Sequence, residues 1–118
     1  MSENDRVHPI AQTPEPPYTA VIFTSVRTPD EHGYGPMSVR MDELARQQPG
    51  YLGHESARED ALSITVSYWV DHEAAAAWKQ VAEHLIAQEH GRSTWYADYT
   101  VRVATVDRDY RADHDRPL

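Results

Sequence analysis

The sequence contains no cysteine among its 118 residues. This absence excludes disulfide bonds, thiolate metal sites, iron–sulfur clusters and cysteine nucleophiles. Basic residues are also scarce, because 11 Lys and Arg stand against 19 Asp and Glu and give a formal net charge of −8. A negative chain is not attracted to nucleic-acid phosphates or to anionic lipid. We therefore expect neither nucleic acid nor a membrane as a partner.

Long hydrophobic runs are missing as well. No apolar run approaches the roughly 20 residues that a membrane-spanning helix needs. Residues 1–6 are polar, with no hydrophobic region behind them, so we expect a cytoplasmic protein. The five glycines are scattered and form neither a P-loop nor GxGxxG, and no serine lies in a GxSxG elbow. Nucleotide binding and serine hydrolysis therefore have no support in the sequence.

Histidine is the one metal-ligand type present in number, with seven copies. None has a neighbour at metal-ligand spacing, and HExxH is absent. His84 and His90 lie six apart on one expected helix, so they point in different directions. We expect no metal site built by the protein itself.

One domain fits the chain length and the hydrophobic content of 40%. Residues 1–17 hold four of the eight prolines among polar side chains, a composition that predicts a flexible arm. The alternative is an arm that lies across a partner subunit. Residues 111–118 are polar and predict a short tail, which leaves 18–110 as the domain.

Periodicity predicts six elements within this domain. Residues 18–27 and 62–70 alternate and are rich in β-branched and aromatic residues, as strands are. Residues 36–48 carry apolar side chains at helical spacing until Pro49 and Gly50. Asp71 is a good N-cap for a helix at 71–90, and Gly91 is a good stop. The remaining strands are expected at 51–58 and 95–106.

The order β-α-β-β-α-β predicts an α+β, ferredoxin-like fold, in which both helices cover one face of a four-stranded antiparallel sheet. The other face would then be bare. An exposed apolar surface of that size marks an interface, so we expect a homodimer that packs sheet to sheet. The expected bare face carries Val21, Phe23, Ser63, Thr65 and Trp69, or the residues that alternate with them.

Aromatic residues gather around the second helix and the strands at its two ends. His84 falls beside the buried stripe of that helix, and a half-buried histidine against aromatic walls could serve as a general base near neutral pH. The alternative is that the tryptophans fill the core and His84 is a solvated boundary residue. The cluster consists of Tyr68, Trp69, Trp78, Trp95, Tyr96 and Tyr99.

The strings PGYLGHESARED at 49–60 and ITVSYWV at 64–70, with the ending GRSTWYADYTVRVATVDRDY at 91–110, resemble the antibiotic biosynthesis monooxygenase (ABM) family. The likeness runs from about residue 18 to residue 110. It implies a dimer with a pocket between helices and sheet in each subunit. It also implies oxygenation of an electron-rich phenol, quinol or polyketide-like aromatic without metal, flavin or other cofactor, with His84 as the catalytic base. The residues expected to contact substrate are Tyr68, Trp69, Trp78, Gln88, Arg92, Trp95, Tyr96 and Tyr99.

Other members of that family bind and degrade heme, which makes heme an alternative cofactor. They use an Asn on the first strand, a Trp on the second helix and a His ten residues after the Trp. Trp78 matches, but Gln88 stands at the His position and strand one offers only Thr24 or Ser25. His54 and His90 remain candidate heme ligands. A non-catalytic ligand-binding or structural dimer is the third hypothesis.

Overall fold

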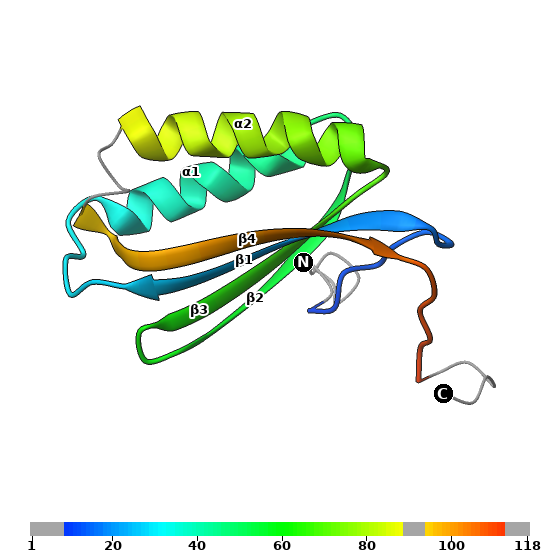
Figure 1. Ribbon diagram of the computed structural model, residues 1–118, viewed down its shortest axis with the longest axis horizontal. Helices are drawn as coiled ribbons and strands as arrows, with labels where there is room; N and C mark the ends of the chain where they lie inside the picture. The colour runs from blue at the N-terminus through cyan, green and yellow to red at the C-terminus, as the bar shows by residue number, and fades with distance from the viewer. Residues whose placement is uncertain (1–8, 89–93, 113–118) are drawn as a thin grey trace, which may run out of the picture.

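The computed structural model describes residues 9–88 and 94–112 and confirms the predicted order of elements. The sheet is antiparallel, with strand order β2-β3-β1-β4. Both helices cover the same face of it (Figure 1). The fold is therefore the predicted α+β, ferredoxin-like arrangement. Its elements are β1 (Tyr18–Arg27), α1 (Tyr34–Gln47), β2 (Tyr51–Glu59), β3 (Leu62–Trp69), α2 (His72–Gln88) and β4 (Tyr96–Val106).

The helices begin close to the predicted positions. Helix α1 starts two residues before the predicted position 36, after an N-cap at Gly33. Asp71 caps α2 as predicted, because its carboxylate accepts a hydrogen bond from the backbone N–H of Ala74 at 2.8 Å. The predicted end of that helix, with Gly91, lies outside the described residues.

The turn between α1 and β2 requires a glycine. Gly50 has φ +85°, and a Cβ built on it would lie 2.7 Å from the Cβ of Ala74 and 2.9 Å from Cγ2 of Val70. Its carbonyl accepts the backbone N–H of Val70 at 2.9 Å. The turn therefore fixes the start of β2 against the segment that leads into α2.

Two stacked indoles form the centre of the core. Trp69, from β3, is 0% exposed, and its ring lies 5.8 Å from that of Trp78, at an interplanar angle of 22°. Trp78 and Leu85 of the predicted helical stripe are buried, together with Ala75. The other predicted members of the stripe, Ala74, Val81 and Ala82, pack at its edge.

The sequence left two faces open as the bare one, and the helices cover the first of them. Side chains of Val21, Phe23, Ser63 and Thr65 line a cavity under the helices, and Trp69 is core. Because apolar residues occupy both sides of the central strands, alternation alone did not identify the side that faces the helices. The alternates form the uncovered face, with Val26 40%, Leu62 46% and Ile64 39% exposed.

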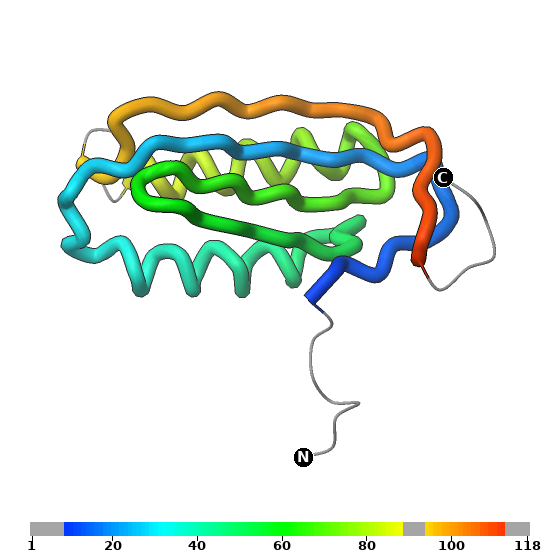
Figure 2. Tube along the Cα trace, turned by 90° about the horizontal axis from the view of Figure 1, so that it is seen from below, coloured from blue at the N-terminus to red at the C-terminus, as the bar shows by residue number. Residues whose placement is uncertain are grey.

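The segment 9–17, expected to be part of a flexible arm, lies against the sheet on the side away from the helices (Figures 1 and 2). The backbone N–H of Ala11 donates to Glu55 Oε2 at 3.0 Å. Arg111 Nη2 donates to the carbonyl of Thr13 at 2.9 Å. The segment is thus held by its own chain at several points. Neither helix of the described ranges is long and apolar enough to cross a membrane.

The Trp69 ring allows a direct test of the core. We expect Trp69→Ala to lower the free energy of unfolding by about 3–5 kcal/mol, because a fully buried indole leaves a cavity that cannot collapse. Val39→Ala, at a position on α1 that is 58% exposed, is the control and should stay within about 0.5 kcal/mol of wild type. Urea unfolding measures both. Equal effects of the two substitutions would contradict this description of the core.

Candidate functional site

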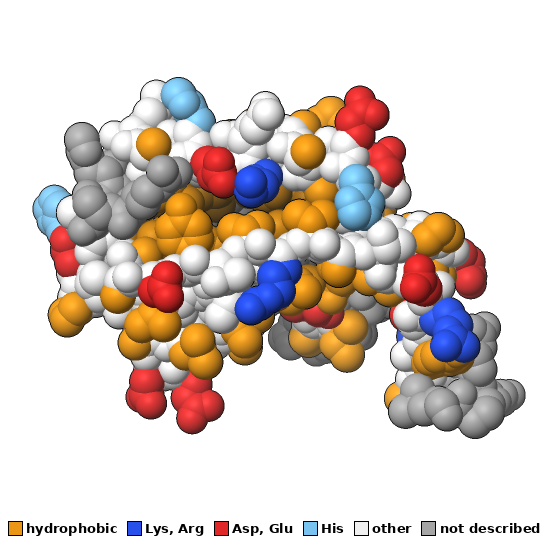
Figure 3. Space-filling model, in the orientation of Figure 1, with side chains coloured by type: hydrophobic (Ala, Val, Ile, Leu, Met, Phe, Trp, Pro, Cys, Tyr) orange, Lys and Arg blue, Asp and Glu red, His pale blue; other side chains and the backbone are white. Residues whose placement is uncertain are grey.

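A cavity of about 150 Å³ lies between the two helices and the sheet. In Figure 3 its hydrophobic lining is visible as a hollow between the helix layer and the sheet. The floor consists of small side chains from the central strands, and the walls are mostly apolar and aromatic. The lining residues used below are Phe23, Ser25, Tyr34, Asp42, His54, Ser63, Thr65, Ser67, Trp78, Lys79, Glu83, Tyr96 and Tyr99.

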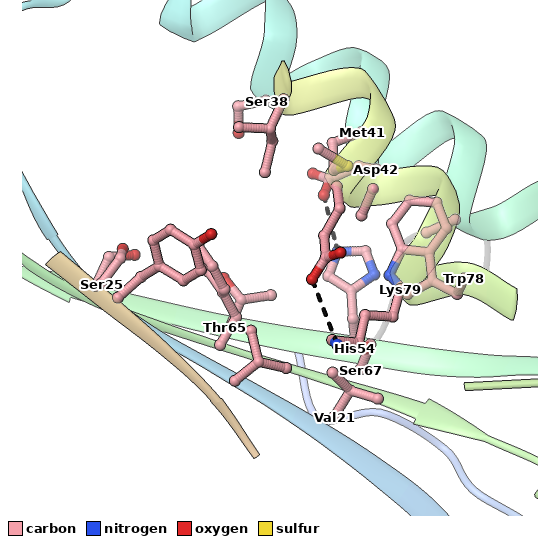
Figure 4. A pocket seen from close by; sticks show the side chains of 18 of the residues that line it. Val21, Ser25, Ser38, Met41, Asp42, His54, Thr65, Ser67, Trp78 and Lys79 are labelled. Carbon is pink, nitrogen blue, oxygen red and sulfur yellow. Dashed lines mark ion pairs between the residues drawn. The ribbon is translucent and has the colours of Figure 1, made fainter. Parts of the chain in front are cut away.

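The ionisable side chains gather at one end of the cavity (Figure 4). Asp42 comes from α1, His54 from β2, and Lys79 and Glu83 from α2. His54 Nε2 lies 3.9 Å from Asp42 Oδ1. Lys79 Nζ lies 3.4 Å from a carboxylate oxygen of Glu83. Trp78 also lines the cavity, so an imidazole and an indole share a largely apolar space.

A β-bulge directs His54 into the cavity. In a regular strand, residues three apart point to opposite faces. The register of β2 shifts between Tyr51, which pairs with Trp69, and Gly53. His54 then pairs with Ser67, so both aromatic rings of β2 face the helices. The Tyr51 hydroxyl lies 2.5 Å from His54 Nδ1. Gly53 has φ +152°, a conformation that favours glycine.

The other end of the cavity is aromatic. Phe23 contacts the rings of Tyr96 and Tyr99, each with a centroid distance of 5.5 Å. These two tyrosines are also three apart on one strand, and a second register shift lets both face the helices. Tyr99 pairs with Ser25, and Tyr96 pairs with Arg27 after the shift. A register shift in each edge strand, β2 and β4, therefore directs side chains into the two ends of the cavity.

Arg27 packs against the aromatic end of the cavity. Its guanidinium lies 3.2 Å from the ring centroid of Tyr34, and the residue is only 4% exposed. Nε donates to the carbonyl of Trp95 at 3.0 Å and Nη2 to that of Asp30 at 3.1 Å. Within the described ranges, Nη1 has no hydrogen-bond partner. A buried cation thus holds the Tyr34 ring in place as a cavity wall.

Phenols near the cavity keep their protons at neutral pH. Burial raises the pKa of Tyr96 far above its ordinary value, and the neighbouring Tyr34 raises it further. Burial also raises the pKa of Tyr51. These hydroxyls therefore act as neutral hydrogen-bonding groups, and His54 supplies the imidazole of the cavity.

The structure brings three of the predicted site residues into the cavity: Trp78, Tyr96 and Tyr99. Trp69 and Trp95 are buried in the core behind it. Tyr68 points to the other face of the sheet, where its hydroxyl donates to Glu55 at 2.7 Å. Arg92 and His90 lie outside the described residues.

His84 and Gln88 are exposed on α2 and do not line the cavity. The predicted role of His84 as base therefore has no support from its position, because it flanks the buried stripe on the solvent side. His54, considered from the sequence only as a heme ligand, is the histidine in the cavity. Its orientation depends on the bulge at Gly53, for which that glycine is the only sequence signal. In the described part of the chain, no group of three or more His, Asp or Glu is placed to hold a metal ion.

Comparison with solved structures identifies the class of fold. SnoaB of Streptomyces nogalater, a cofactor-independent oxygenase, aligns in a mutant form with a TM-score of 0.60 at 15% identity, over 82% of this chain and 98% of that chain. The heme-degrading protein Rv3592 of Mycobacterium tuberculosis aligns with a TM-score of 0.50 at 16% identity, over 80% and 98%. The predicted resemblance to ABM-type monooxygenases is thus confirmed at the level of the fold.

Sequence comparison identifies the family. The uncharacterized protein YqjZ of Bacillus subtilis is 54% identical over 100 residues, which cover 84% of this chain and 88% of that protein. The chain belongs to the family of YqjZ. Jasmonate monooxygenase ABM of Pyricularia oryzae is 29% identical over 62 residues, 52% of this chain and 29% of that protein. No family model matches the sequence.

The buried phenol of Tyr96 makes stability depend on pH. Its pKa is raised in the folded state above the ordinary value of 10.0, so this contribution is complete below pH 10.0 and is lost as the pH rises above it. We expect Tyr96→Phe to reduce the fall in unfolding free energy between neutral and strongly alkaline pH. Urea unfolding at both pH values measures it. An unchanged fall in Tyr96→Phe, or an equal reduction in the exposed-site variant Tyr110→Phe, would contradict the assignment.

Proposed function

We propose that the protein is a cofactor-independent monooxygenase that acts on a small electron-rich phenol or quinol, with His54 as the proton acceptor. The observation that carries this proposal is an imidazole that lines a largely apolar cavity together with Trp78. The ABM-type fold and the oxygenase described for SnoaB support it. The chemistry needs a base, a dry site and a substrate that is itself the electron donor.

Tyr51 and Asp42 both lie next to the His54 imidazole, which would act as the base. With its hydrogen on Nδ1, the imidazole donates to the Tyr51 oxygen and leaves Nε2 free to take a proton from a substrate hydroxyl. The imidazolium that forms keeps the hydrogen bond to Tyr51 and faces the Asp42 carboxylate at 3.9 Å.

Deprotonation then allows the substrate to react with oxygen directly. The phenolate gives one electron to O₂, and the substrate radical and superoxide combine into a C–O bond. The O–O bond of this peroxide breaks, so one oxygen atom stays on the ring carbon as a carbonyl. His54 returns its proton to the peroxide, the ring carbon loses its C–H proton, and the other oxygen atom leaves with these two hydrogens as water. The protein supplies deprotonation, proximity and exclusion of water.

Cavity size limits the substrate. An engineered apolar cavity of about 150 Å³ takes up benzene, and drug-sized ligands occupy about 300–1,000 Å³. The cavity of about 150 Å³ in this protein therefore suits a single substituted ring. Its aromatic end would stack on that ring, while the hydroxyl faces His54.

Heme is the alternative suggested by the heme-degrading relative of similar fold. The residues present do not fit it well. A porphyrin is far larger than the cavity of about 150 Å³. Titration with hemin tests this alternative, because a ligated iron would give a Soret band that His54→Ala removes.

The central test compares the two histidines on which structure and sequence disagree. We expect His54→Ala to lower the rate of oxygen consumption with small phenols or hydroquinones about a hundredfold to ten-thousandfold, the usual contribution of general acid–base catalysis. His84→Ala, at an exposed position outside the cavity, should retain the wild-type rate. An oxygen electrode measures both rates, and melting temperatures control for folding. The reverse pattern would return the role to His84, and full activity in both variants would remove imidazole from the mechanism.

We also propose that the protein is a homodimer packed through the face of the sheet that the helices leave uncovered. Val26, Leu62 and Ile64 are well exposed there, and exposed apolar patches of this kind mark interfaces. Light scattering should give about twice the chain mass of 13.5 kDa.

A charge within that patch tests the interface. Ile64→Lys should yield a monomer, whereas Val39→Lys, at an exposed position on α1, should leave the mass unchanged. A wild-type monomer at micromolar concentration would contradict the dimer.

A further inference from the structure

Two residues of the cavity are joined behind its wall by a chain of aromatic side chains. Trp78 stacks on Trp69, with ring centroids 5.8 Å apart. Tyr51 packs edge-on against Trp69 at 5.6 Å. The Tyr51 hydroxyl lies 2.5 Å from Nδ1 of His54. The series therefore begins at Trp78 and ends at His54, and both line the cavity.

The chemistry of these groups suits one-electron oxidation. Indole and phenol are the protein side chains that lose an electron most readily, apart from thiols, and this chain has no cysteine. A phenol must release its proton when it loses an electron, so it needs a hydrogen-bonded base. Arg46 also hydrogen-bonds to the Tyr51 side chain and can only donate. The Tyr51 hydroxyl hydrogen is therefore available for donation to His54.

We propose that Tyr51 is a redox-active tyrosine that receives oxidising equivalents from the cavity through Trp78 and Trp69. The proposal rests on the proposed function only for the oxidant, an oxygen-centred radical such as a peroxyl that escapes productive reaction. Its effect would be to move a damaging radical away from the substrate and into a buried site.

Each electron and proton has a destination. The peroxyl takes one electron from Trp78 and becomes a peroxide anion. Trp69 then gives an electron to the Trp78 radical cation, and Tyr51 gives an electron to the resulting Trp69 radical cation. The Tyr51 proton moves to Nδ1 of His54 in the same step. The products are a neutral phenoxyl radical and an imidazolium, so charge is conserved.

This transfer uses the tautomer of His54 that accepts from Tyr51, whereas deprotonation of substrate uses the other one. A hydroxyl both donates and accepts, so the same hydrogen bond serves both tautomers. Burial supports the oxidative role further, because Trp69 is 0% exposed and water cannot reach it.

A second Trp–Tyr contact in the molecule serves as an internal comparison. Trp95 and Tyr34 have ring centroids 5.8 Å apart, close to the spacing of Trp69 and Tyr51. Tyr34, however, is hydrogen-bonded to the phenol of Tyr96. A phenol is a far weaker proton acceptor than an imidazole. The two Trp–Tyr pairs therefore differ in the proton acceptor beside the tyrosine, which is an imidazole for Tyr51 and a phenol for Tyr34.

Pulse radiolysis of the full chain tests the proposal without any substrate. Azide radicals oxidise indole rings, and transient absorption follows the indole radical and the phenoxyl radical separately. In the wild type, phenoxyl absorption should rise as indole-radical absorption decays. Tyr51→Phe, which keeps the ring, should lose most of this rise, while Tyr34→Phe should retain it. His54→Gln should slow the rise roughly a hundredfold, by analogy with the loss of a general base.

Three results would contradict a redox-active Tyr51. A wild-type phenoxyl signal in Tyr51→Phe, an unchanged rate in His54→Gln, or no conversion of indole radical in the wild type would overturn the proposal. Circular dichroism and urea unfolding confirm that each variant is folded before it is compared. Because the measurement needs no turnover, oxygen consumption and radical transfer can fail independently, and failure of one is distinguishable from failure of the other.

Discussion

The strict two-residue period of β-strands is the constraint on which this site depends, because the site exists where that period is broken. Each edge strand of the sheet has one register shift, near the Tyr51 end of β2 and near the Tyr96 end of β4. Each shift turns two aromatic or imidazole side chains, three apart in sequence, toward the helices. Without the shifts, one member of each pair would point to the opposite face.

The cavity itself arises from small residues on the two central strands. Ser25, Ser63, Thr65 and Ser67 form its floor, where larger side chains would fill the space under the helices. Ser67 has a second function, since its hydroxyl accepts the indole N–H of Trp69 at 2.8 Å. The polar floor thus leaves room for a ligand and also satisfies the one polar group of a fully buried ring.

The sequence predicted the parts that follow regular periods. Element order, the Asp71 cap and burial of Trp78 all depend on spacing along one element, and the structure confirms them. The side of the sheet that faces the helices was left open between two alternatives, because both sides of β1 carry apolar residues. The position of His54 could not be predicted, since a bulge changes which face a residue points to and composition encodes it only through Gly53.

Because the bulge at Gly53 could not be predicted, the sequence favoured a histidine on a helix, His84, as the base. A helix keeps its period over its whole length, so the sequence could place His84 beside the buried stripe of α2, and the structure shows that it is exposed there. A base that must work on a desolvated hydroxyl needs the opposite environment, an apolar cavity with a hydrogen-bonding partner inside it. His54 has both, through the cavity and the Tyr51 hydroxyl, and the Asp42 carboxylate lies 3.9 Å from its Nε2 atom. The bulged strand therefore contributes the imidazole, while the regular helices contribute the walls.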